Sequence, residues 1–273
     1  EEKLEEEGDA DRLVELWLGR TEVETSGPGR AHCLRQVAAI FEKKKGQMAE
    51  AFQALLAAQK EAPDMGQLDE LERLAGTSGL WVELLGALRE LMPQFAAEAR
   101  PELWLRIARL YGEKLNHAEY ALASLAEVQK LELTDAALRL RTSELRANLT
   151  RRAERWKELA EALGQLAAEV PERERKIDLY LEQGDLYESR LSDGVSAMAA
   201  FKKAHTADPD SRDALQALEH SLRRHLNWPD LTQLLDAKAS QAERRGDAEG
   251  ALESRREAAQ LCKIGRASCR ERV

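Results

Sequence analysis

An internal repeat constrains the fold of this chain more than any other feature. Trp81, Trp156 and Trp228 each open a segment in which a leucine follows after three residues and another after seven. Side chains with these spacings lie on one stripe of an α-helix. The tryptophans are separated by 75 and 72 residues. A period of this length with helical spacing inside it predicts an all-α protein made of stacked repeats.

A second pattern lies between the tryptophan segments. Large, apolar, small and aromatic residues follow one another at fixed offsets, as over residues 104–111. Residues 180–187 repeat these offsets, with Gly184 as the small residue and Gln183 in the apolar place. An Ala, Phe, Ala and Pro series continues this pattern in register and ends at Pro209. A small residue lets the second helix of a hairpin cross closely. The two patterns together predict two helical hairpins in each period.

The repeats predict the domain organisation of the whole chain. Residues 1–29 are expected to form a partial repeat and a loop, with the loop at Thr25–Gly29. Residues 30–263 are expected to form a solenoid of antiparallel helical hairpins that is truncated at both ends. The hairpins are predicted near 30–63, 65–98, 100–133, 135–170, 175–209 and 211–246, with a half hairpin at 248–263.

These motifs resemble those of tetratricopeptide-repeat (TPR) proteins, particularly large bacterial ones in which Trp-opened and Tyr/Ala-marked hairpins alternate. The similarity covers nearly all of residues 10–263 and is strongest over 177–209. The Trp-opened hairpins depart from the pattern, because Glu72 and Glu219 stand where a small residue is expected. The resemblance implies a right-handed superhelix whose first helices line a concave groove.

The two ends of the sequence differ from the repeats. Residues 264–273 resemble a translated sequencing adapter, so we expect them to be a non-native scar. The chain begins at Glu1 without a methionine, which indicates a fragment of a longer product. Each truncated end is expected to expose an apolar face, so end-to-end self-association is predicted.

Composition excludes several classes of function. The formal net charge is −9 and lysine and arginine are not clustered, which argues against a nucleic-acid partner. No apolar run has the roughly 18 residues of a membrane span. Gly-rich phosphate loops, catalytic motifs and metal-ligand spacings are absent from the sequence. We therefore expect no enzyme, cofactor or metal, and we favour a cytoplasmic location.

The resemblance implies that the chain is a scaffold that binds a protein or peptide partner through its concave face. The alternative is a docking or sensory region of a larger signalling enzyme whose catalytic domain is outside this sequence. In TPR proteins the partner-facing residues lie on the first helix of each hairpin. By that placement the candidate partner-binding residues are His32, Arg35, Glu102, Leu105, Arg109, Asp178, Leu181 and Asp185.

Overall fold

The computed structural model describes residues 10–131 and 135–270, and the side chains in these ranges as far as Cys262. This part of the chain is helical and contains no strand. The α-helices are α2 (Ala10–Val23), α3 (Gly27–Lys43), α4 (Met48–Glu61), α5 (Leu68–Ser78), α6 (Trp81–Leu91), α7 (Arg100–Glu113), α8 (Ala118–Gln129), α9 (Ala136–Arg152), α10 (Trp156–Glu169), α11 (Arg173–Ser189), α12 (Gly194–Ala207), α13 (Arg212–Arg224), α14 (Trp228–Arg244) and α15 (Ala248–Arg270). Short 3-10 helices are η1 (Met65–Gln67), η2 (Met92–Gln94) and η3 (Ala97–Ala99).

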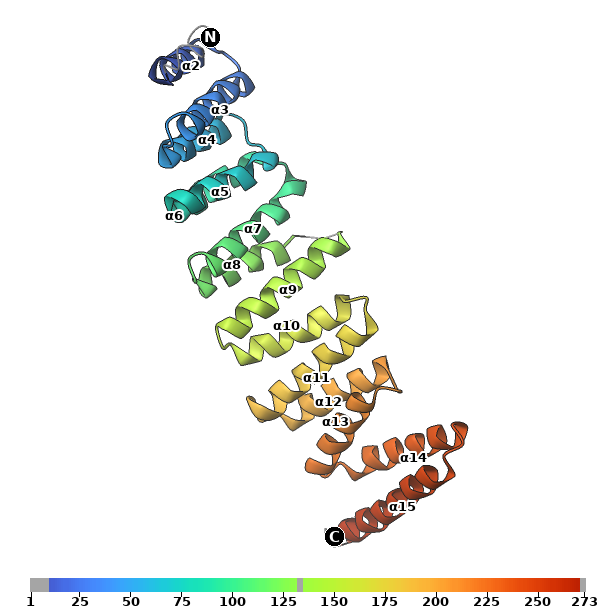
Figure 1. Ribbon diagram of the computed structural model, residues 1–273. Coiled ribbons are helices and arrows are strands. Elements are labelled where there is room, and N and C mark those ends of the chain that lie inside the picture. The colour runs from blue at the N-terminus through green and yellow to red at the C-terminus, as the bar shows by residue number, and fades with distance from the viewer. Residues whose placement is uncertain (1–9, 132–134, 271–273) are drawn as a thin grey trace. The chain divides into compact units, whose positions relative to one another are not determined.

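The chain forms two compact units, residues 1–138 and 139–273, which we call unit 1 and unit 2. Within each unit, successive helices run antiparallel and lie side by side, as α3 and α4 do in unit 1 and α11 and α12 in unit 2 (Figure 1). The structure is therefore an all-α solenoid of helical hairpins, as predicted. The right-handed superhelix implied by the resemblance stays a prediction.

The hairpin turns share one backbone feature. A residue with positive φ stands two positions before the second helix of each hairpin: Gly46, Gly79, Asn116, Glu154, Ser192 and Leu226. A left-handed residue ends a helix because it turns the chain away from the helical path. The same turn thus reverses the chain at every hairpin, and Gly246 stands in the same place before α15.

The loop predicted at Thr25–Gly29 is wrong over its second half. Helix α3 begins at Gly27, where the Ser26 hydroxyl accepts a hydrogen bond from the Gly29 N–H at 3.1 Å. Pro28 lies in the first turn, where a missing N–H breaks no helical hydrogen bond. The Ser-Gly-Pro-Gly segment is therefore a helix start. At the other end, α15 continues to Arg270, past the end predicted at residue 263.

The predicted leucine stripe forms the core of the Trp-opened hairpins. The leucines three residues after each tryptophan are at most 1% exposed, and so are those seven residues after it: Leu84, Leu159, Leu231, Leu88, Leu163 and Leu235. The tryptophan rings themselves are only half-buried. Each ring stands at the first residue of its helix, so one side of it remains open to solvent.

The position expected to hold a small residue is filled in two ways. At Gly184 on α11 the Phe201 ring of α12 packs against the glycine, and a Cβ there would overlap the ring. At Glu72 and Glu219 the carboxylate is instead paired with cations. Glu72 accepts from Arg106 at 2.9 Å, and Glu219 lies 3.2 Å from the Lys238 ammonium. Ion pairing therefore lets a large polar residue occupy this site.

Candidate partner-binding face

The predicted residues of α3 lie in unit 1. His32 is exposed, and its ring meets the Trp17 ring of α2 edge to face, with centroids 5.9 Å apart. Arg35 is half-buried one turn further along the helix. Residues three apart lie on the same side of a helix, so both side chains are on one side of α3, where His32 and Trp17 line a hollow of about 820 Å³.

On α7 the prediction for Leu105 is wrong. This side chain is 4% exposed, because α7 buries residues on more than one side, Leu103 and Ile107 among them. Arg109 is exposed, but its guanidinium donates to the Glu72 carboxylate of α5 at 2.7 Å. Glu102 is half-buried. The α7 surface is thus occupied largely by packing and by an ion pair to the preceding hairpin.

The predicted residues of α11 lie in unit 2. Asp178 and Asp185 are exposed, and no described cation pairs with either carboxylate. Leu181 lies between them on the same stripe and is half-buried against the cluster that contains Leu218. Burial and the neighbouring Glu188 and Glu182 raise the pKa of the Asp185 carboxyl above its usual value. A positive charge placed beside Asp185 would relieve this unfavourable environment.

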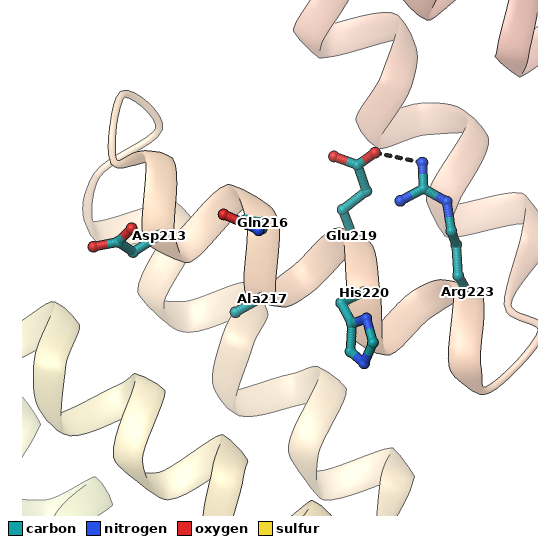
Figure 2. Close-up of a pocket in the computed structure, with 6 residues that line it drawn as sticks. All are labelled: Asp213, Gln216, Ala217, Glu219, His220 and Arg223. Carbon is teal, nitrogen blue, oxygen red and sulfur yellow. Dashed lines mark hydrogen bonds and ion pairs between the residues drawn. The ribbon is translucent and has the colours of Figure 1, made fainter.

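The sequence prediction missed the corresponding face of α13. Each candidate on α11 has a counterpart 35 residues later: Asp213, Gln216 and His220. With Ala217 and Arg223 these residues line an open hollow of about 590 Å³ along α13 (Figure 2). The α11 candidates stand six and three residues before Gly184 and one residue after it. The same positions relative to Glu219 give Asp213, Gln216 and His220, so the sequence contains the signal for them.

The charges along α13 are not equivalent. Glu219 borders the hollow, but its carboxylate is paired with Arg223 at 2.5 Å and with Lys238 at 3.2 Å, and its side chain is only 12% exposed (Figure 2). Asp213 is exposed and has no cationic partner among the described residues. Asp213 is therefore the carboxylate of this hollow that is available to a ligand.

Helices α11 and α13 are joined through Glu188 near the end of α11. Its carboxylate accepts from the Ser221 hydroxyl at 2.5 Å and from Arg224 at 3.1 Å, both on α13. The exposed residues of the two helices thus lie on neighbouring elements of one unit. We call Asp178, Leu181, Asp185, Asp213, Gln216 and His220 the α11–α13 face.

Among the described residues, no group of three or more His, Cys, Asp or Glu side chains could hold a metal ion. Within the same residues, no helix is both long enough and apolar enough to span a bilayer.

The helix order, the hairpin turns and the buried signature positions agree in both units. The fold is a TPR-like helical repeat. No family model matches the sequence, and no curated protein matches it either. The α11–α13 face of this TPR-like chain is formed by the first helices of two successive hairpins.

Several solved structures are similar to the chain at low identity. A TPR protein from Parabacteroides merdae is 17% identical, with a TM-score of 0.39, over 94% of this chain and 95% of that one. The C-terminal part of a TPR protein from Cytophaga hutchinsonii is 16% identical, with a TM-score of 0.41, over 80% and 97%. The TPR2AB domain of yeast Sti1, in its pHSP90 complex, is 17% identical with a TM-score of 0.29, over 85% and 96%. Similarity at this level carries no information about a shared partner.

Proposed function

We propose that this chain is an interaction scaffold that binds a partner polypeptide with basic side chains on the α11–α13 face. The observation that supports this most is the set of exposed carboxylates at Asp178, Asp185 and Asp213, for which the described residues provide no ion pair. Most other carboxylates of the first helices nearby are neutralised, as Glu188 is by Arg224. Unpaired carboxylates next to an open hollow favour a cationic ligand.

The chemistry of the face also limits what the partner can be. The hollow along α13 is shallow and lined by one helix, so it fits side chains of a polypeptide better than an enclosed small molecule. Half-buried Leu181 and Ala217 add apolar surface between the charges. The alternative, a docking region of a larger signalling enzyme, stays a prediction that no feature of this face favours.

A charge-reversal experiment tests the proposal. The probe is a fluorescein-labelled peptide of alternating lysine and alanine, titrated with the full chain in low salt and followed by fluorescence anisotropy. We expect Asp178→Lys and Asp213→Lys each to weaken binding, by about 1 kcal/mol or roughly fivefold, because each replaces an attractive exposed charge by a repulsive one. The double substitution is expected to abolish measurable binding.

Asp236→Lys provides the matched control. Asp236 is exposed on α14, the second helix of the hairpin that contains α13, and its substitution changes the net charge by the same amount. Its affinity for the peptide should stay near that of the unchanged chain. Equal weakening by Asp236→Lys and Asp213→Lys would mean that only overall charge attracts the peptide, and the proposal would be wrong.

A further inference from the structure

The spacing of groups on the α11–α13 face restricts the conformation of a bound partner. Asp178, Leu181 and Asp185 are spaced by three and seven residues along α11. In an α-helix seven residues span about 10.5 Å and return to nearly the same side. The two exposed carboxylates therefore stand about two helical turns apart, with a half-buried leucine between them.

Helix α13 repeats this arrangement beside α11. Asp213, Gln216 and His220 have the same spacing of three and seven residues, and all three are exposed. They lie on the wall of the hollow along α13. Two neighbouring helices thus each present a pair of exposed polar groups two turns apart.

A second α-helix matches this repeat and an extended strand does not. Helical residues seven apart are separated by the same distance of about 10.5 Å and point to one side. In a strand this distance corresponds to about three residues, and side chains an odd number apart point to opposite faces. A helical ligand can therefore place basic side chains on both carboxylates of α11 at once, with its apolar residues on Leu181.

We infer that the α11–α13 face binds an amphipathic basic helix of another polypeptide, with basic residues seven apart and an apolar residue midway between them. This inference rests on the proposed function, because it specifies the partner class of the same face. The basic residues bind Asp178 and Asp185, and the partner's remaining polar side chains meet Asp213, Gln216 and His220. Leu181 forms the apolar contact at the centre.

Two peptides of identical composition separate this inference from the proposed function. Both are alanine-based, so both form helices, and both contain three arginines and two leucines. One carries its arginines at every seventh residue with a leucine midway, and the other carries them at every fifth residue, which spreads them around the helix. Each is labelled and titrated with the full chain by fluorescence anisotropy.

We expect the seven-residue peptide to bind at least tenfold more tightly. Asp178→Asn combined with Asp185→Asn should remove this preference, whereas Asp236→Asn should preserve it. Equal affinity of both peptides, lost on substituting the aspartates, would overturn the helical inference and leave the proposed function standing. Binding of neither peptide, together with failure of the lysine–alanine probe, would overturn both. A preference that persists in the aspartate variant would place the ligand elsewhere and also overturn the inference.

Discussion

At the scale of single residues, the contact between Gly184 and Phe201 gives a direct test of hairpin packing. A methyl group at Gly184 would overlap the Phe201 ring, which is 2% exposed and cannot move into solvent. Gly184→Ala should therefore destabilise the protein by about 1–3 kcal/mol, measured by urea denaturation. Gly86→Ala is the control, because nothing lies within 4 Å of the Cβ that it adds to α6. That substitution should stabilise by up to about 1 kcal/mol, and equal effects of both would contradict the packing.

The environments of individual side chains differ in how well the sequence predicts them. The close approach of α12 to Gly184 can be predicted from the sequence, because the small residue recurs at a fixed position in the repeated hairpin pattern. The burial of Leu105 cannot be predicted in this way. A leucine at this position of the first helix is exposed or buried according to how many sides of α7 are covered by other helices. The pairing of Glu72 with Arg106 and Arg109 is also hidden, because the partners lie 34 and 37 residues away.

At the scale of helices, the starts at Trp81, Trp156 and Trp228 are predicted correctly, but the contacts of their rings are not. The guanidinium of Arg190, which follows α11, lies 5.0 Å from the centre of the Trp156 ring on α10. The Lys114 ammonium lies 5.5 Å from the Trp81 ring in the same relation. A cation over an aromatic face is attracted to it, so each pair joins a second helix to the first helix of the next hairpin.

This contact predicts a measurable coupling between α10 and α11. Arg190→Gln should lower the free energy of unfolding by about 0.5–1 kcal/mol, because the cation above the Trp156 ring is lost. In a Trp156→Leu background the same change should have little effect, which a double-mutant cycle measures. Lys157→Gln removes an exposed cation of α10 with no described ring contact and should be neutral in both backgrounds. An unchanged effect of Arg190→Gln without the tryptophan would exclude the coupling.

At the scale of the whole molecule, the repeat pattern predicts the fold class but not the division into two units. The pattern of tryptophans and leucines continues past the sequence boundary between residues 138 and 139, which lies within α9. In a solenoid each hairpin contacts mainly its neighbours, so the repeat pattern does not show where one compact unit ends and the next begins. Each unit nevertheless has its own buried clusters, with Leu88 in unit 1 and Leu163 in unit 2.

Two equivalent core substitutions test whether the units unfold separately. Leu88→Ala and Leu163→Ala truncate the leucine that follows the tryptophan by seven residues in each unit. Each should lower the local free energy of unfolding by about 2–5 kcal/mol. Hydrogen exchange followed by mass spectrometry should then show loss of protection in α10–α12 for Leu163→Ala, with α4–α7 unchanged, and the reverse for Leu88→Ala. The unchanged half serves as the internal control in each variant. Uniform loss of protection along the chain in either variant would mean that the repeats unfold as one cooperative body.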